Sequence, residues 1–320
     1  MSALDYGDVS LVSRHVSTIQ SRDEIDTSVE FCGRKLSLPI VSSPMKDVSD
    51  GHFCKKMMDY GAFGIIHRFS NIAEQVAQYR VAPGAGCAIG INNDWFERFD
   101  ALYNAGCSIF CLDIANGASI NLEPVIKELF TRNCYIIAGN TVSAEGYLYL
   151  DKSYTDAVRV GVAGGAGCST KNATGIYHPM VSLIQETYKT KLARTNSRAK
   201  IIADGGIKEP GDFCKAIGFG ADVVMLGSLL ANTIDSPAER LYKNGKHYTI
   251  FRGSASLDIQ ATYKEVPRYI EGKSILIDYN SERLEDLLNR FMDGLRSSMS
   301  YFNSRNLIQY RENMDYVTHK

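Results

Sequence analysis

Eight short apolar runs, separated by stretches with apolar residues at helical spacing, constrain the fold of this chain more than any other feature. Each run is nearly continuously apolar and rich in isoleucine, valine or alanine, which is typical of parallel strands covered on both faces. The predicted strands are Pro39–Ser43, Gly64–His67, Cys87–Ile91, Ser108–Asp113, Tyr135–Gly139, Ala157–Val162, Lys200–Asp204 and Val223–Gly227.

Small and polar residues end several of these runs, among them Asp113, Asn140, Asp204 and Ser228. Such endings mark the active face of a (β/α)8 barrel, so we predict an α/β TIM barrel with a mobile flap at its active site. A doubly wound sheet is the alternative, because it uses the same alternation of strands and helices. The predicted helices are Phe53–Tyr60, Glu74–Arg80, Trp95–Asn104, Leu122–Thr131, Ser143–Tyr149, Met180–Lys189 and Gly211–Gly218.

The length of 320 residues suits one domain, because barrels of this type reach it as a single unit. We expect residues 1–320 to form one catalytic domain with no regulatory insert. Residues 234–281 match no strand–helix unit, which predicts a long excursion over the active face and a candidate lid. Leu284–Ser300 is expected to form a closing helix.

The composition excludes several classes of protein. A net charge of −1 and the lack of a strongly basic stretch give little support for nucleic-acid binding. The chain contains neither an apolar run long enough to span a membrane nor an apolar signal core, so we expect a cytoplasmic protein. The eight cysteines are scattered and form no CxxC pair, which argues against disulfides and zinc and predicts mostly buried thiols.

A glycine-rich segment after the sixth predicted strand, residues 161–170, contains Cys168 and Thr170. Glycines let the backbone approach a ligand closely, and an exposed loop at a barrel mouth suits a reactive thiolate. The alternative is a flexible turn with a chance cysteine. The glycine spacing fits a dinucleotide fingerprint poorly, and we expect no helix directly after the loop.

The two next predicted strands also end in residues suited to a nucleotide. Asp204 precedes Gly205 and Gly206, and its carboxylate is able to accept hydrogen bonds from ribose hydroxyls. Gly227 and Ser228 could offer backbone N–H groups to a phosphate, since barrels often bind phosphate with their last loops. Each segment alone is equally consistent with a plain turn.

Taken together, these segments resemble the IMP dehydrogenase/GMP reductase family over residues 4 to 300. Several motifs occur in the family's order, and the segment from Cys111 to Gly117 is especially similar to GMP reductases. The motifs are Leu4–Val12, Ser43–Met45 with Val48, Cys111–Gly117, Ala138–Asn140, the glycine-rich segment 161–170 (the cysteine loop), Ala203–Gly206, Val224–Ser228 and Arg252–Gly253.

The resemblance implies covalent chemistry on a purine monophosphate. Cys168 is implied as the nucleophile that attacks C2 of the purine. Thr170 and Glu271 are implied as the pair that handles the proton of the leaving group. In GMP reductases, ammonia leaves and NADPH delivers a hydride to C2, which gives IMP. In IMP dehydrogenases, the hydride goes to NAD and water then releases XMP.

The resemblance also assigns residues to ligands. It implies a homotetramer and, in many members, a monovalent cation such as K⁺. The implied substrate contacts are Asp204, Gly206, Gly227, Ser228, Arg252, Gly253, Arg268 and Lys273. The implied cofactor contacts are Asp113, Ala115, Asn116 and Asn140, and the implied cation ligands are backbone carbonyls of Gly161, Ala163 and Cys168.

Three features favour the reductase over the dehydrogenase: no regulatory insert, a short span between Gly253 and Glu271, and a reductase-like segment at 171–175. Against these, Arg268 and Tyr269 resemble the Arg-Tyr pair that activates water in dehydrogenases, an interpretation that the short span disfavours.

The chain also departs from the family pattern at Lys46, Ala163, Gly164, Ala166 and Ser254. Loss of the family serine at position 166 removes a phosphate contact worth about 1 kcal/mol. These departures keep two further alternatives open: a deoxy or modified purine nucleotide as substrate, or a nucleotide-binding protein without catalysis.

Overall fold

The computed structural model describes residues 3–14, 16–92, 94–262 and 266–319. Its centre is a parallel sheet with the strand order β4-β11-β10-β9-β8-β7-β6-β5, and Val41 beside Phe63 joins the two edges. Two backbone hydrogen bonds of 2.9 Å, from Ser42 to Phe63 and from Phe63 to Ile40, support this closure. The strands are β4 (Ile40–Ser42), β5 (Ile65–Ile66), β6 (Gly86–Ile89), β7 (Ile109–Leu112), β8 (Tyr135–Thr141), β9 (Ala157–Val160), β10 (Lys200–Asp204) and β11 (Val223–Leu226).

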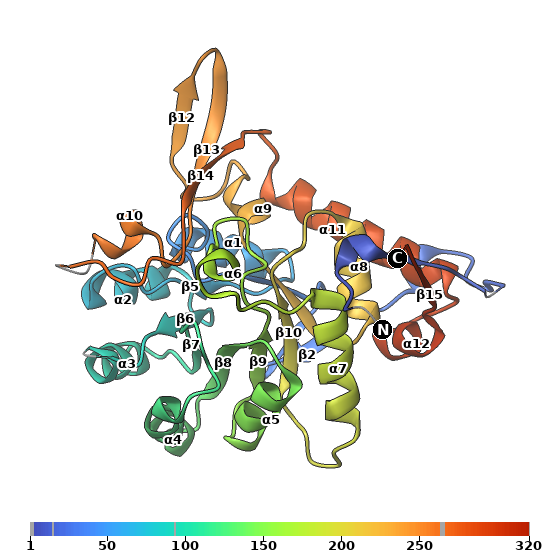
Figure 1. Ribbon diagram of the computed structural model, residues 1–320, viewed down its shortest axis with the longest axis horizontal. Coiled ribbons are helices and arrows are strands. Elements are labelled where there is room, and N and C mark those ends of the chain that lie inside the picture. Colours follow the sequence, from blue (N-terminus) through green and yellow to red (C-terminus); the bar gives the residue numbers. More distant parts are fainter. Residues whose placement is uncertain (1–2, 15, 93, 263–265, 320) are drawn as a thin grey trace.

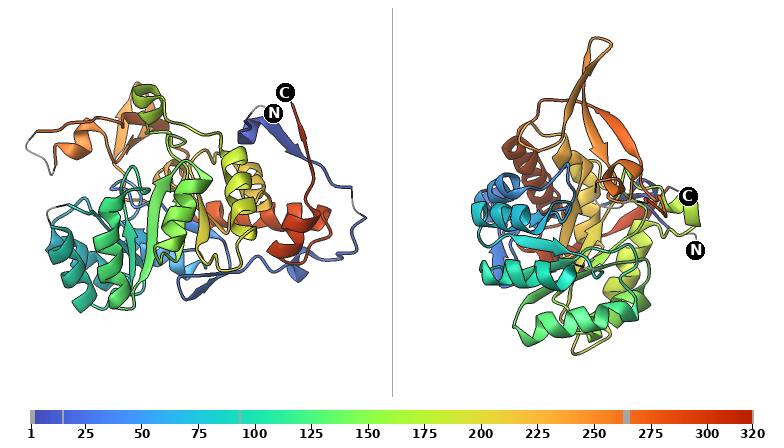
Figure 2. Two further views of the ribbon diagram at one scale, coloured as in Figure 1. Left: turned by 60° about the horizontal axis from the view of Figure 1, so that its bottom comes forward. Right: turned by 90° about the vertical axis from the view of Figure 1, so that its left-hand side faces the viewer.

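The barrel prediction is therefore confirmed, and the doubly wound alternative is wrong. All eight predicted strands form, because each apolar run is buried both toward the barrel axis and toward the helices. Helices surround the sheet, as Figures 1 and 2 show. They are α1 (Gly51–Asp59), α2 (Ile72–Val81), α3 (Trp95–Asn104), α4 (Glu123–Thr131), α5 (Ala144–Lys152), α7 (Met180–Leu192), α8 (Pro210–Gly218) and α11 (Leu284–Tyr301).

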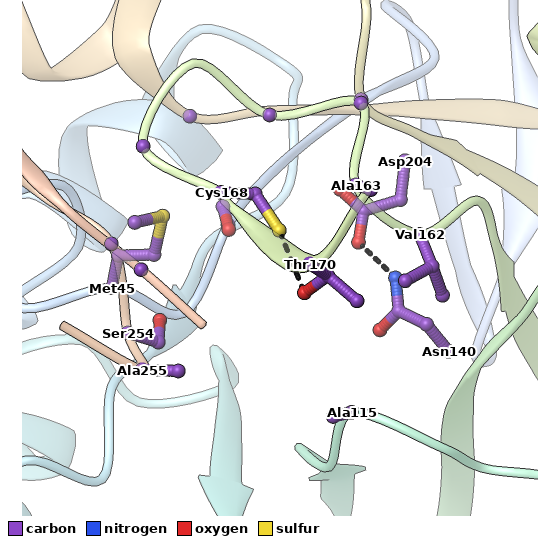
Figure 3. Close-up of a pocket in the computed structure, with 18 of the residues that line it drawn as sticks. Met45, Ala115, Asn140, Val162, Ala163, Cys168, Thr170, Asp204, Ser254 and Ala255 are labelled. Atoms are coloured by element: carbon purple, nitrogen blue, oxygen red, sulfur yellow. Dashed lines mark hydrogen bonds between the residues drawn. The ribbon is translucent and has the colours of Figure 1, made fainter. Parts of the chain in front are cut away.

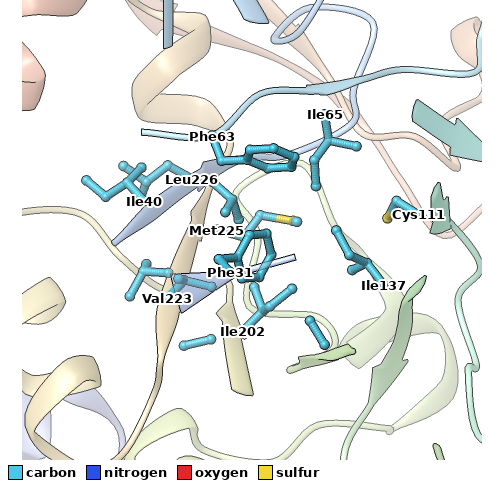
Figure 4. Packing of buried hydrophobic residues seen from close by; sticks show 14 of the residues in the cluster. Phe31, Ile40, Phe63, Ile65, Cys111, Ile137, Ile202, Val223, Met225 and Leu226 are labelled. Carbon is cyan, nitrogen blue, oxygen red and sulfur yellow. The ribbon is translucent and has the colours of Figure 1, made fainter. Parts of the chain in front are cut away.

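Side chains from the strands fill the barrel (Figure 4). A hairpin of β2 (Val29–Phe31) and β3 (Arg34–Leu36) closes its amino-terminal mouth. Phe31 packs edge-on against Phe63 with ring centroids 5.4 Å apart. The turn of the hairpin lies against the start of β8, since a Cβ added to Gly33 would meet the Tyr135 hydroxyl at 2.3 Å. The described residues thus cover the amino-terminal mouth, whereas the carboxyl-terminal mouth holds a cavity.

The closing helix α11 forms as predicted and buries Leu284, Leu288, Phe291 and Leu295 at helical spacing. Phe291 packs against Phe213 of α8. The terminal segments add elements that the sequence pattern did not predict, and both termini lie on one side of the molecule (Figure 2). They are η1 (Tyr6–Asp8), β1 (Val9–Leu11), η2 (Arg22–Glu24), α12 (Leu307–Asn313) and β15 (Tyr316–Thr318), with β1 paired to β15. In the middle of the chain, the short helix η3 (Ile120–Leu122) precedes α4.

Residues 234–281 contain more regular structure than the sequence indicated. A three-stranded antiparallel sheet of β12 (Arg240–Lys243), β13 (Lys246–Arg252) and β14 (Ser274–Asp278) projects from the barrel (Figure 1). The short helix α10 (Leu257–Gln260) lies between β13 and β14 in the chain. Asn244 and Gly245 both have positive φ, as a type I′ hairpin turn requires. Residues 263–265 of the predicted lid lie outside the described residues.

No helix in the described ranges combines the length and the apolar character that crossing a membrane requires.

Candidate active site

A cavity of about 470 Å³ opens at the carboxyl-terminal mouth of the barrel. Segments that follow β4, β7, β8, β9, β10 and β11 line it, together with the excursion after β13. Most of the residues that the sequence assigned to ligands meet here: Asp113, Ala115, Asn140, Gly161, Ala163, Cys168, Thr170, Asp204, Gly206, Gly227, Ser228, Gly253, Arg268 and Glu271.

The cysteine loop is held from both sides by backbone contacts. Gly206 donates a 3.0 Å hydrogen bond to the carbonyl of Gly164, and Lys273 donates one of 2.9 Å to the carbonyl of Gly167. A Cβ on Gly253 would lie 2.3 Å from the Gly167 carbonyl oxygen, so this approach requires glycine. The loop is therefore an ordered platform for the residue that follows it.

Cys168 lies at the end of this platform with its side chain facing the cavity (Figure 3). It is half-buried, whereas the other seven cysteines are buried and free. The sulfur lies 3.2 Å from the hydroxyl of Thr170, and this hydroxyl donates a 2.8 Å hydrogen bond to a carboxylate oxygen of Glu271. The three side chains form a continuous path along which a proton is able to move.

Two separate elements bring this path together. The short helix α6 (Thr170–Thr174) begins two residues after the cysteine, which corrects the expectation that no helix follows the loop directly. Glu271 comes from the excursion, whose backbone is joined to the loop by a bridge between Cys168 and Gly272. Ser169 also donates a 2.8 Å hydrogen bond to the carbonyl of Glu271. The contact between the excursion and the loop thus completes the path.

A buried arginine on the floor of the cavity was missed in the sequence. Arg159 donates a hydrogen bond of 2.8 Å to Asp113, and bonds of 3.0 and 3.1 Å to one oxygen of Asp204. Arg68 also donates to Asp113, at 3.2 Å, and Asn140 donates to Asp204 at 2.7 Å. The sequence did contain a signal for it, namely an arginine inside the apolar run that forms β9. Burying such a charge is costly unless it is paired, so its position indicates a carboxylate partner nearby.

This network sets the charge of the carboxylates. Burial alone would raise the pKa of Asp113, but Arg159 and Arg68 outweigh it, so the pKa of Asp113 lies below its usual value. Burial would lower the pKa of Arg159, but Asp204 and Asp113 raise it. Asp113 therefore remains an anionic hydrogen-bond acceptor at neutral pH.

Three residues assigned from the sequence do not line the cavity in the described structure. Arg252 is directed to other partners, since it donates a 2.9 Å hydrogen bond to Asp47 and one of 2.7 Å to Glu239. Lys273 contributes its backbone to the cysteine loop, and its side chain is exposed. Asn116 is exposed beyond the cavity wall. The motif positions alone could not show which way these side chains point.

The described residues contain no group of three or more His, Cys, Asp or Glu side chains arranged to hold a metal ion. Of the carbonyls assigned to a monovalent cation, that of Gly161 accepts a 2.7 Å hydrogen bond from Asn140. This bond competes with coordination of a cation by the same oxygen.

Comparison with known proteins identifies the family of this chain. Residues 3–320 match the family model described as the IMP dehydrogenase / GMP reductase domain. Among similar curated proteins is a GMP reductase from Chromobacterium violaceum, 38% identical over 315 residues, which are 97% of this chain and 96% of the relative. GMP reductases from Oenococcus oeni and Staphylococcus aureus are 33% and 32% identical, over 99% of this chain and 97% and 96% of their own. This chain therefore belongs to the IMP dehydrogenase/GMP reductase family.

Proposed function

We propose that this protein is a GMP reductase, which converts GMP to IMP and ammonia with NADPH as reductant. The observation that carries the proposal is the path from the Cys168 sulfur through the Thr170 hydroxyl to the Glu271 carboxylate at the edge of one large cavity. Such a path serves a reaction in which a sulfur nucleophile loses a proton and a poor leaving group gains one.

In the proposed reaction, the Cys168 thiolate attacks C2 of the purine and forms an S–C2 bond. The C2–N bond then breaks, and the amine takes a proton from the Thr170–Glu271 pair and leaves as ammonia. NADPH, when bound beside Asp113, Ala115 and Asn140, would supply the hydride that C2 receives. The S–C2 bond finally breaks, which releases IMP and regenerates the thiolate. Protonation matters because an unprotonated amine is a very poor leaving group.

The other cavity residues are proposed to orient the two ligands. Asp204 accepts hydrogen bonds from the ribose, with Gly206, Gly227 and Ser228 at the phosphate, and Gly253 and Arg268 near the base. Asp113, Ala115 and Asn140 face the nicotinamide. The small side chain of Ala115 leaves room for a flat ring there, and the anionic Asp113 suits a carboxamide N–H group, so these residues fit the cofactor.

We further propose a cytoplasmic location, which eight free cysteines support, since thiols persist in reducing compartments. A homotetramer remains a proposal from the family resemblance. K⁺ is proposed with less structural basis, because the Gly161 carbonyl already accepts a hydrogen bond from Asn140.

The test is transfer of an isotope. Purified protein is given GMP and NADPH that carries deuterium at its transferable position, and the product is examined by mass spectrometry and NMR. The proposal predicts IMP with one deuterium at C2. Absence of IMP contradicts it, and formation of NADH from IMP and NAD under the same conditions would favour the dehydrogenase instead.

A further inference from the structure

Charged side chains lining the cavity divide into a paired and an unpaired group. Arg68 and Arg159 form ion pairs with Asp113 and Asp204, so these four charges balance one another. The other charged side chains of the cavity wall are the cations Lys208 and Arg268 and the anion Glu271, which lies on the same excursion as Arg268. None of these three forms an ion pair within the described residues. Among the described residues that line the cavity, Lys208 and Arg268 are therefore the two cations left to compensate the charge of a dianionic phosphate.

Few of the uncharged hydrogen-bond donors that the sequence indicated for the phosphate are free to bind it. The N–H group of Gly206 is directed to the Gly164 carbonyl at 3.0 Å. Ala166 lines the cavity without a hydroxyl. Ser228 begins the helix α9 (Ser228–Ala231), which is a single turn long and has only a small dipole. These donors alone leave much of the phosphate charge without compensation.

Lys208 lies on the side of the cavity where the phosphate is expected. It follows Gly206 by two residues, and its backbone N–H donates a 3.0 Å hydrogen bond to Asp212, which fixes the start of its side chain. Arg268 instead belongs to the excursion, where its backbone N–H donates a 3.1 Å hydrogen bond to Gln260. Because the two unpaired cations come from different walls, Lys208 is the one near the loops after β10 and β11.

We propose that Lys208 binds the substrate's 5′-phosphate through its ammonium group and thereby selects nucleoside monophosphates over nucleosides. The inference rests on the proposed function for the orientation of the nucleotide. A lysine on a flexible stem acts as a point charge toward phosphate oxygens, and such charge-assisted bonds are stronger than the neutral bond that Ala166 cannot make.

The experiment compares ligands with and without the phosphate. Dissociation constants for GMP and guanosine are measured by calorimetry for the unchanged protein and for Lys208→Met, Lys208→Arg and the control Lys189→Met. Lys189 is an exposed lysine of α7 outside the cavity lining, so its loss changes the net charge equally. Thermal unfolding checks that each variant is folded.

The proposal predicts that Lys208→Met weakens GMP binding about ten-fold or more while guanosine binding is unchanged. Lys208→Arg should retain most of the affinity, Lys189→Met should match the unchanged protein, and high salt should reduce the difference. Equal effects on GMP and guanosine, or no effect on either, would overturn the proposal. Binding of GMP without reductase turnover would instead defeat the proposed function, and the difference between GMP and guanosine would still decide the role of Lys208.

Discussion

Thr170 donates a 2.8 Å hydrogen bond to Glu271, although 101 positions separate them in the chain. The hydroxyl is buried and also lies 3.2 Å from the Cys168 sulfur, so it connects the nucleophile with the carboxylate. The two partners come from α6 and from the excursion that packs on it. Proton transfer therefore depends on the excursion lying against the cysteine loop.

Glu271→Gln should lower kcat by a factor on the order of 10²–10⁴, since an amide is unable to supply the proton. The KM for GMP should change much less, because the proposed role concerns the leaving group. Thr170→Val should have a similar effect and Thr170→Ser a smaller one. Steady-state kinetics checks this, and a Glu271→Gln variant with unchanged kcat would remove the carboxylate from the mechanism.

Arg159→Met should lower the free energy of unfolding by about 3 kcal/mol, because it leaves two buried carboxylates without their shared partner. Lys191→Met is the matched control. It also removes a buried ion pair, but Asp222 keeps Lys200 at 3.6 Å and Arg311 at 3.8 Å. Urea unfolding should show the smaller loss for the control, and equal losses would contradict this account of the network.

His67 should make the protein less stable in mild acid. Burial, with Lys46 and Arg98 nearby, lowers its pKa to about 4 from an ordinary 6.5. Between these values the unfolded chain binds a proton that the folded protein does not, so stability falls as pH decreases through this range, by up to about 3 kcal/mol. Urea unfolding of His67→Gln should show a shallower dependence between pH 6.5 and 4, and an identical slope would contradict the prediction.

Gly253→Ala should reduce activity strongly, because the new Cβ would lie 2.3 Å from the Gly167 carbonyl and displace the cysteine loop. Gly7→Ala is the control, since its Cβ would meet nothing within 4 Å. Reductase assays at saturating substrate compare the two, and full activity of Gly253→Ala would show that the loop tolerates a shift at this point.

The barrel was predictable because parallel strands buried on both faces leave an apolar signature that is local in sequence. The endings at Asp113, Asn140 and Asp204 then placed the active face. The ion-pair network was not predicted, because pairing of Arg159 with Asp113 and Asp204 depends on side chains from three strands, β9, β10 and the end of β7, that lie near one another only in the folded sheet.

The excursion, residues 234–281, shows which local features the sequence predicts and which it does not. Asn244 and Gly245 carry a recognisable hairpin signal between β12 and β13, which was overlooked. The direction of Arg252 had no such signal, since the motif specifies the position of the residue and its contact with Asp47 decides where the side chain points. The positions of the family motifs in the sequence thus located the site. The direction of each side chain, by contrast, could be known only from its contacts in the structure.

The most direct test of the central claim is to quantify NADPH consumed and IMP formed from GMP by the unchanged protein and by Cys168→Ala, after calorimetry has shown that both bind GMP. We predict one IMP for each NADPH oxidised by the unchanged protein and no product from the variant. Product formation by Cys168→Ala at the rate of the unchanged protein would contradict the assignment of the sulfur as the nucleophile.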